Sequence, residues 1–273
     1  MKNILVVITT AFVPTGGLTT VMMNYYRMMN KEEVKIDFAS TNNPPQVLLD
    51  EIHASGSEYY QLPDRKNVLA YFFALKKLCR GYDAIHVHAN SAMAVMELQA
   101  AIWAGIKIRI IHNHSSRSQH NLLNQLFLSL YRRSFTQAVA CSDEAGEWLY
   151  GKNGFITLRN AINAKRFKFD VVKRLIMRHN FGFGDDEYVI GHIGKFMEAK
   201  NHSFLIEVFA KYHALQPKSK LLLIGDGELR HLVEAAIDKN KVNDCVILAG
   251  LRSDIPDVLQ AIDIFLFPSI YEG

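Results

Sequence analysis

Short apolar runs rich in valine and isoleucine alternate along the chain with segments of helical periodicity. Such runs of about four to eight residues are typical of strands buried on both faces, and intervening helices are typical of parallel sheets. The predicted strands are Ile4–Ile8, Val34–Phe38, Ala84–His88, Ile108–His112, Ala138–Cys141, Val189–Ile193, Leu221–Ile224, Val246–Leu248 and Ile262–Phe267. The pattern therefore predicts an α/β fold with doubly wound sheets.

This rhythm is interrupted between residues 160 and 186. Phe167-Lys168-Phe169-Asp170, a short basic helix and a Phe-Gly-Phe-Gly sequence occupy the stretch, and the next predicted strand opens at Tyr188. We therefore place a domain boundary near residue 165, between an N-terminal domain of residues 1–165 and a C-terminal domain of residues 166–273. The second domain has only four clear strands and ends just after one of them. We expect it to be incomplete and the natural protein to extend further.

The composition is that of an ordinary folded protein. Hydrophobic residues make up 49% and charged residues 21% of the 273 positions, enough apolar material for two buried cores. The formal net charge of +4 is too small to indicate nucleic acid as a partner. It is compatible with an anionic nucleotide or with a negatively charged membrane surface.

The spacing of the cysteines and the length of the apolar stretches bear on the cellular compartment. Cys79, Cys141 and Cys245 lie far apart and form no CxxC pair, so no disulfide framework is expected and a reducing cytoplasm fits best. No stretch approaches the roughly 20 apolar residues that span a bilayer, so any membrane contact would be peripheral. Residues Leu122–Arg133 could rest on a membrane surface, although an amphipathic helix packed on the core is the favoured alternative.

Two loops at predicted helix starts suit an anionic ligand. Gly16 and Gly17 follow the first strand, and two glycines allow the backbone to approach a ligand at a helix N-terminus. A tight strand-to-helix turn explains them equally well. Lys195 and Lys200 flank a similar loop after the Val189–Ile193 strand, which suits a diphosphate, whereas the alternative is a pair of solvated lysines.

Four histidines form a third group of candidate residues. His86, His88, His112 and His114 fall at or just after the ends of two predicted strands, where open α/β sheets bind ligands. The spacing of two places both side chains of each pair on one side of an extended backbone, as zinc ligands require. No cysteine or acidic ligand lies close by in sequence, so we favour an active cleft and expect no metal.

Two further segments are ambiguous from the residues alone. Gly225-Asp226-Gly227 follows a strand and opens a helix, so its glycines suit a sharp turn or a ligand contact. Glu228 reads as a carboxylate placed favourably near a helix N-terminus. Glu272 follows the last predicted strand, and its role cannot be inferred without further context.

Taken together and in this order, the segments resemble the retaining glycosyltransferases of family 4, which have the GT-B fold of two facing Rossmann-like domains. The resemblance covers almost the whole chain. Its segments are Gly16-Gly17, Asn160–Asn163 with Phe167, Gly194-Lys195 with Lys200, Gly225–Gly227, and Pro268-Ser269 with Glu272-Gly273. Residues 112–115 and 140–146 resemble more narrowly the transferases of bacterial capsule and exopolysaccharide assembly.

Several positions depart from the family pattern. Lys195 stands where arginine is commoner, so a point charge replaces a bidentate phosphate contact. Ala161 replaces a glycine of the segment that crosses between the domains. Asn201 replaces a glycine after Lys200, a mild change because asparagine tolerates left-handed backbone. The gravest departure is the end of the chain inside a motif whose second glutamate would follow Gly273, and we expect little or no transferase activity from the chain as written.

The resemblance implies roles for particular residues. Lys195 and Lys200 would neutralise the leaving diphosphate, so that neither a metal ion nor another cofactor is required. His112 would lie beside the reacting sugar, with His114 as the second choice for that place, and Glu272 would face the donor sugar. His88, like His114, would line the cleft or contact the acceptor. Further donor contacts are expected from Gly16, Gly17 and Gly227.

The resemblance also implies partners and a reaction. The N-terminal domain would bind a saccharide or lipid-linked acceptor and the C-terminal domain a nucleoside-diphosphate sugar, with retention of the anomeric configuration. We expect a cytoplasmic protein in cell-surface polysaccharide synthesis, with peripheral contact to the inner face of the plasma membrane left open and no nucleic-acid partner. The alternatives are a nucleotide-sugar epimerase of the same fold and a non-catalytic binding protein of a polysaccharide-assembly complex.

Overall fold

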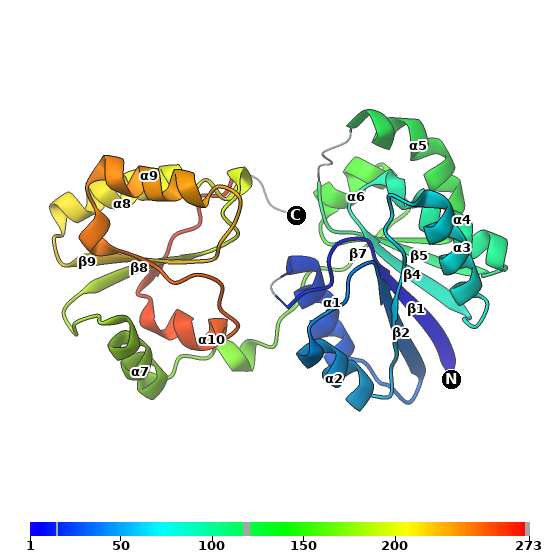
Figure 1. Ribbon diagram of the computed structural model, residues 1–273, viewed down its shortest axis with the longest axis horizontal. Coiled ribbons are helices and arrows are strands. Elements are labelled where there is room, and N and C mark those ends of the chain that lie inside the picture. Colours follow the sequence, from blue (N-terminus) through cyan, green and yellow to red (C-terminus); the bar gives the residue numbers. More distant parts are fainter. Residues whose placement is uncertain (15, 117–120, 271–273) are drawn as a thin grey trace. The chain divides into compact units, whose positions relative to one another are not determined.

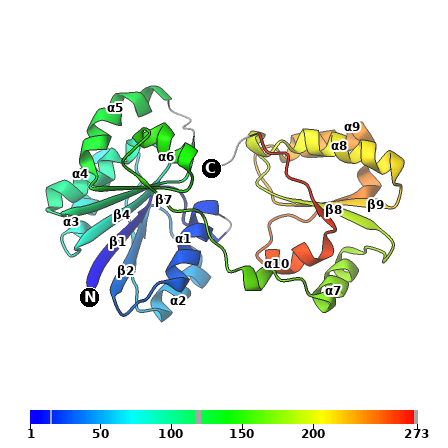
Figure 2. The same cartoon turned by 180° about the vertical axis from the view of Figure 1, so that it is seen from behind.

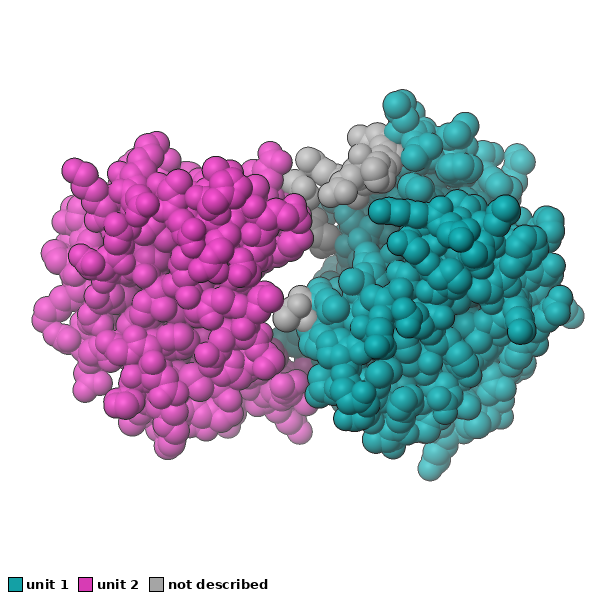
Figure 3. Space-filling view, in the orientation of Figure 1, with its two compact units in different colours: residues 1–162, 273 teal, residues 163–272 magenta. Residues whose placement is uncertain are grey.

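The computed structural model describes residues 1–14, 16–116 and 121–270, and their contacts divide the chain into two compact units (Figure 3). Unit 1 comprises residues 1–162 and unit 2 residues 163–272. The sequence analysis placed the boundary at residue 165. Each unit holds one parallel sheet with helices on both faces.

Unit 1 is built on a seven-stranded sheet in the order β3-β2-β1-β4-β5-β6-β7. Its strands are β1 (Lys2–Ile8), β2 (Val34–Ser40), β3 (Tyr59–Gln61), β4 (Ala84–Ala89), β5 (Ile108–Asn113), β6 (Gln137–Ala140) and β7 (Ile156–Thr157). Its helices are α1 (Gly17–Met28), α2 (Gln46–Ala54), α3 (Val68–Cys79), α4 (Val95–Ala104), α5 (Asn121–Ser134) and α6 (Asp143–Tyr150). A short 3₁₀ helix, η1 (Ala92–Ala94), precedes α4.

Alternate residues of the strands feed two separate cores. Val6 and Ile8 of β1 pack with α1 and α2 on one face, whereas Leu5 and Val7 pack with α3 to α6 on the other (Figures 1 and 2). Because both faces are covered, consecutive apolar residues such as Ile4–Ile8 of β1 can be buried on alternate sides of the sheet.

Unit 2 is built on a four-stranded parallel sheet in the order β10-β9-β8-β11. Its strands are β8 (Tyr188–Ile193), β9 (Ser219–Ile224), β10 (Val246–Leu248) and β11 (Ile264–Phe265). Its helices are α7 (Val171–Phe181), α8 (His202–Leu215), α9 (Arg230–Asn240) and α10 (Ile255–Val258). Short 3₁₀ helices are η2 (Ala164–Phe167), η3 (Glu198–Lys200), η4 (Asn243–Cys245) and η5 (Leu259–Ala261). Helices α8 and α9 cover one face, and α7 and α10 the other (Figure 1).

A buried ion pair ties helix α7 to the sheet of unit 2. Arg178 is only 4% exposed, and its Nη1 lies 3.2 Å from Oδ2 of Asp263. Its Nη2 donates to the backbone oxygens of Gly184 and Glu187 at 2.6 and 2.7 Å. Asp263 Oδ2 also accepts from the backbone N–H of Val189, at 2.8 Å. These partners compensate the cost of burying the charge of Arg178.

The predicted α/β fold with doubly wound parallel sheets is confirmed. Each predicted apolar run contains a strand, although the Ile262–Phe267 run forms only the two residues of β11. Two strands were missed, β3 and β7, which have three and two residues and lie at opposite edges of their sheet. No helix among the described residues combines the length and the apolar character needed to cross a bilayer.

Each sheet changes winding direction once. The reversal falls between β1 and β4 in unit 1, and between β8 and β11 in unit 2. Ligands of open α/β sheets bind outside the carboxyl ends of the strands at such a point. The histidines of β4 in unit 1 and the loop of Lys195 and Lys200 after β8 in unit 2 lie at these two places.

Candidate active site

The first candidate segment is the turn from β1 into α1. The backbone N–H of Gly16 donates to Val13 O at 2.9 Å, and a Cβ at Gly16 would lie 3.2 Å from that oxygen. A Cβ at Gly17 would meet no atom within 4 Å. The tight turn therefore accounts for Gly16, whereas the exposed backbone of Gly17 at the helix start is open to a ligand.

Next to this turn, the four predicted histidines form a cluster at the carboxyl ends of β4 and β5. The sheet register places His88 opposite His112. The rings of His86 and His88 are 4.2 Å apart between centroids, and those of His112 and His114 are 4.1 Å apart. Val6 and Ile8 pair with His86 and His88, so the imidazoles lie on the face of the sheet that α1 and α2 cover.

Burial keeps these imidazoles neutral near pH 7. Removal from water lowers the pKa of His86 and of His114 to about 4 and that of His112 to about 2, and mutual repulsion adds to the effect at His86 and His112. The same causes hold the pKa of His88 well below its ordinary value. The cluster therefore offers neutral hydrogen-bonding groups rather than positive charge.

Much of the hydrogen-bonding capacity of this cluster is unused. Nδ1 of His88 lies 2.9 Å from Nε2 of His114. The buried nitrogens without a hydrogen-bond partner among the described residues are Nε2 of His86, Nε2 of His88, and both ring nitrogens of His112. Buried ring nitrogens normally have a hydrogen-bond partner, so these nitrogens are available to bind a ligand.

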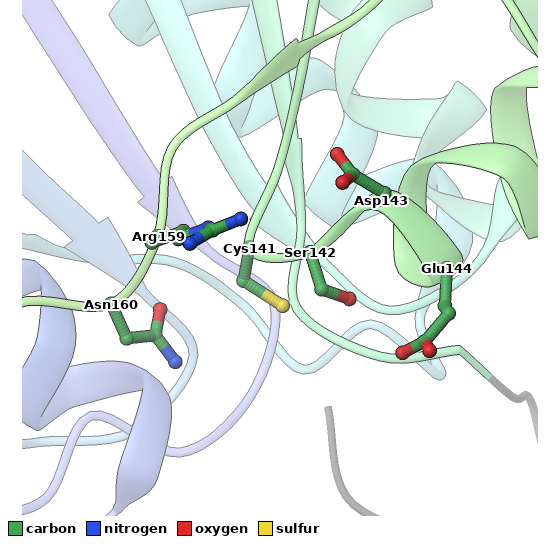
Figure 4. Close-up of a pocket in the computed structure, with 6 residues that line it drawn as sticks. All are labelled: Cys141, Ser142, Asp143, Glu144, Arg159 and Asn160. Carbon is green, nitrogen blue, oxygen red and sulfur yellow. The ribbon is translucent and has the colours of Figure 1, made fainter.

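A cavity of about 430 Å³ lies at the carboxyl end of β6, the strand next to β5 (Figure 4). It is lined by Cys141, Ser142, Asp143, Glu144, Arg159 and Asn160. Ser142 caps α6 by accepting from the Ala145 N–H at 3.1 Å. Cys141 donates its backbone N–H to Asn113 O at 3.0 Å, which joins this wall to β5.

Asn113 has a structural role that its position between two histidines obscures. It is fully buried, and its Nδ2 donates to Ser115 O at 2.8 Å and to Ala145 O at 2.7 Å. These bonds fix the segment after β5 against the first turn of α6. The amide therefore holds the neighbouring imidazoles in place.

In unit 2, Lys195 and Lys200 lie on the loop that follows β8. Lys195 is about half exposed, and its Nζ lies 2.8 Å from Oε1 of Glu228. This ion pair lowers the pKa of Glu228. Glu228, on the loop after β9, thus pairs with Lys195 on the loop after β8. The sequence analysis considered only its position near a helix N-terminus and did not predict this pair. Nζ of Lys200 lies 5.3 Å from the ring centre of Phe267.

Glycines let the loops after β8 and β9 meet backbone to backbone. Gly225 has a φ of +141°, and a Cβ there would lie 2.0 Å from Gly194 O. A Cβ at Gly227 would lie 2.5 Å from Phe196 O. The N–H of Phe196 donates to Asp226 O at 3.0 Å. Loop packing therefore requires Gly225 and Gly227, whatever contact Gly227 makes with a donor.

Asn201 follows Lys200 in left-handed conformation, with φ 54° and ψ 44°. The expectation that asparagine tolerates this backbone is confirmed. The segment after β11 lies alongside, because Ile270 N donates to Ala199 O at 2.8 Å. Glu272 lies outside the described residues.

Two buried histidines near this loop were missed by the sequence analysis. The ring centroids of His192 in β8 and His202 in α8 are 5.0 Å apart. Burial lowers the pKa of His202 to about 4, and both its ring nitrogens lack a hydrogen-bond partner among the described residues. The i, i+2 signal that marked the first cluster was absent, since these histidines come from different elements.

Comparison with known protein families decides the assignment. The family model described as Glycosyltransferase Family 4 matches residues 15–172, more than half of the chain. The chain belongs to glycosyltransferase family 4. The model described as Glycosyl transferases group 1 matches residues 173–273. The protein is therefore a glycosyltransferase.

Relatives of this family 4 protein extend beyond the length of the chain. EpsF of Bacillus subtilis is 29% identical, with 94% of this chain and 71% of EpsF covered. The UDP-Gal:alpha-D-GlcNAc-diphosphoundecaprenol alpha-1,3-galactosyltransferase of Escherichia coli is 22% identical, with 94% of this chain and 71% of that protein covered. The solved structure of Anabaena HepE with UDP and glucose is 17% identical, with a TM-score of 0.81 over 98% of this chain and 74% of HepE. These matches show that this family 4 chain has a GT-B type of fold.

Proposed function

We propose that this glycosyltransferase moves a sugar from a nucleoside-diphosphate sugar, bound by unit 2, to an acceptor bound by unit 1, with retention of the anomeric configuration. The observation that carries the donor assignment is the loop of Lys195 and Lys200 at the reversal point of the second sheet, where α/β folds bind ligands. The structures of HepE with UDP and with UDP-glucose support the same class of donor.

The chemistry proposed for the lysines is electrostatic. Breaking the bond between sugar and diphosphate adds negative charge to the leaving group, and a nearby lysine stabilises it more strongly as the charge grows. A close lysine–phosphate pair contributes roughly 4 kcal/mol of gross attraction before desolvation and screening. The transfer then needs no metal ion. Glu228 keeps Lys195 oriented, and the diphosphate competes with that carboxylate.

For unit 1, we propose that the neutral histidines contact sugar hydroxyls, which can both donate to and accept from them. His112 is the first candidate beside the reacting sugar, because both of its ring nitrogens lack a partner among the described residues. His88 and His114 pair with each other and are assigned to the acceptor side. The names of the relatives favour a saccharide or lipid-linked acceptor in polysaccharide synthesis.

We further propose a cytoplasmic location, with peripheral contact to the inner face of the plasma membrane. Helix α5 supports the contact, since Leu122 and Leu126 are 84% and 71% exposed on a helix whose last turn carries Arg132 and Arg133. Exposed apolar and basic side chains on one helix suit an anionic lipid surface.

The donor assignment is tested by binding and turnover of nucleotide sugars. A thermal-shift panel identifies the donor, because binding to the folded state raises its melting temperature. Lys195→Ala and Lys200→Ala should each abolish most of the shift and, in any form of the protein that shows transferase activity, lower kcat about 10²-fold. Lys211→Ala, an exposed lysine of α8, is the matched control and should behave as the wild type. Unchanged kcat in both loop variants would remove the lysines from the mechanism.

A further inference from the structure

A cysteine and a histidine of unit 2 form a hydrogen-bonded pair away from the residues assigned to sugar transfer. Sγ of Cys245 lies 3.2 Å from Nε2 of His213. His213 belongs to the last turn of α8, and Cys245 ends η4 just before β10. The pair lies at the amino ends of β9 and β10, whereas the loop of Lys195 and Lys200 follows the carboxyl end of β8. It is therefore separate from the proposed donor site.

The backbone determines which nitrogen of His213 carries a proton. Nδ1 of His213 lies 3.1 Å from both the carbonyl oxygen and Oγ of Ser219, the first residue of β9. Because a carbonyl oxygen only accepts hydrogen bonds, Nδ1 carries the proton of the neutral ring and donates to this oxygen. Nε2 therefore presents its lone pair to Cys245, and the thiol S–H donates to it.

This arrangement is that of an activated thiol. The thiolate is the reactive form of cysteine, and a neighbouring base produces it by taking the proton of the thiol. A nucleophile, a base within hydrogen-bond distance and a third group that orients the base are the parts such a site requires. Cys245, His213 and the Ser219 carbonyl oxygen supply these three parts in order.

The other two cysteines are less accessible. Cys79 and Cys141 are buried, whereas Cys245 is partly exposed, and the other residues of η4, Asn243 and Asp244, are exposed. Burial raises the pKa of the Cys79 thiol to about 12 and also raises that of the Cys141 thiol. Of the three cysteines, Cys245 therefore combines access from solvent with a neighbouring base.

We propose that Cys245 is a modification site that reacts with low-molecular-weight disulfides and carries the resulting mixed disulfide, with His213 as its base. The Sγ proton passes to Nε2 of His213, and the thiolate attacks one sulfur of the disulfide. The S–S bond of the reagent breaks, and its other half leaves as a thiolate that takes the proton from His213. The disulfide is the only oxidant required, and one thiol is released for each protein modified. The proposal does not depend on the proposed function, because adduct formation is measured without substrates.

The test exposes folded protein at pH 7 to excess oxidised glutathione and maps the adducts by mass spectrometry. We expect one adduct per chain, on Cys245. Cys245→Ser should lose the adduct, whereas Cys79→Ala and Cys141→Ala should keep it. With dithionitrobenzoate as a faster disulfide probe, His213→Asn should slow the reaction about three- to tenfold. Asparagine can keep the bond to Ser219 but has no base at the position of Nε2, and its smaller side chain does not reduce access to the thiol.

A second histidine variant serves as the matched control. His231→Asn changes an exposed histidine of α9 and should react at the wild-type rate. Folded wild-type protein that forms no adduct on Cys245 would overturn the proposal, and so would a His213→Asn protein that reacts as fast as the wild type. If His213→Asn fails to fold, the wild type still decides. Cys245 must then react faster at pH 7 in the folded protein than in the urea-unfolded chain, and an equal or slower rate refutes the role of His213.

Discussion

Burial makes the histidines of unit 1 neutral, and their hydrogen-bond partners differ from one residue to the next. His112 has two unpartnered ring nitrogens among the described residues, whereas His114 has one nitrogen within hydrogen-bond distance of His88. Both are neutral near pH 7 because their pKa values are lowered to about 2 and about 4. The difference between them is therefore one of available hydrogen bonds rather than of charge.

This difference makes a kinetic prediction. His112→Ala should lower kcat by at least about tenfold, the loss expected for one good hydrogen bond in the transition state, and by more than His114→Ala does. Circular dichroism should show both variants folded. Steady-state rates with a saturating donor measure the effect. A near-normal His112→Ala enzyme beside a damaged His114→Ala enzyme would assign the catalytic place to His114.

His202 predicts how stability depends on pH. Its pKa in the folded protein is about 4, below the ordinary histidine value of 6.5, so the unfolded chain binds a proton first as the pH falls. Stability associated with His202 is complete above about pH 6.5 and is lost progressively toward pH 4. Urea unfolding at pH 5 should show a loss of up to about 2 kcal/mol relative to pH 7 from this group.

A leucine at this position serves as the control for that effect. His202→Leu removes the titrating group and two unpartnered ring nitrogens while keeping a similar apolar volume. We expect near-normal stability at pH 7 and a smaller loss at pH 5. If the variant loses as much stability as the wild type between these pH values, other groups carry the dependence.

Among elements, the loops after β8 and β9 depend on each other through their glycines. Gly225→Ala should destabilise unit 2 by about 2–4 kcal/mol, because a Cβ would lie 2.0 Å from Gly194 O at a φ of +141°. Gly17→Ala should leave stability unchanged or raise it by about 0.5 kcal/mol, since the site is open and begins a helix. It should nevertheless weaken ligand binding if the backbone there approaches a donor. Denaturant midpoints and nucleotide-sugar titrations of both variants check the pair.

Element prediction succeeded where the sequence pattern and the burial agree. The Ile4–Ile8 run of β1 and the Leu221–Ile224 run of β9 are apolar throughout because both faces of their sheets are covered. β3 and β7 are too short for a pattern, and they form because neighbouring strands offer an edge.

The Lys195–Glu228 pair and the Arg178–Asp263 pair join residues far apart in the chain, so no local rule could predict them. The histidine cluster lies between these cases, since its two halves were visible but their convergence required the register of β4 and β5.

Over the whole molecule, the candidate residues separate into neutral imidazoles in unit 1 and lysines in unit 2. Hydrogen exchange can test this division with UDP as the probe. UDP should slow amide exchange in residues 194–200 and 225–229, because a diphosphate bound at the loop of Lys195 and Lys200 would oppose local opening of these two packed loops. Helix α2, residues 46–54, is the internal control and should exchange at its normal rate. Protection confined to unit 1 would contradict the donor assignment.

The strand order of unit 1 also has a consequence for synthesis of the chain. Strand β1 lies between β2 and β4, and Ile4 is paired with Ala84. A ribosome adds roughly 5–20 residues per second, so β1 waits several seconds for its second neighbour. During that time its Leu5 and Val7 face lacks the helices α3 to α6 that later bury it. Nascent chains of this protein therefore expose an apolar strand that chaperones can bind, and slower translation prolongs that exposure.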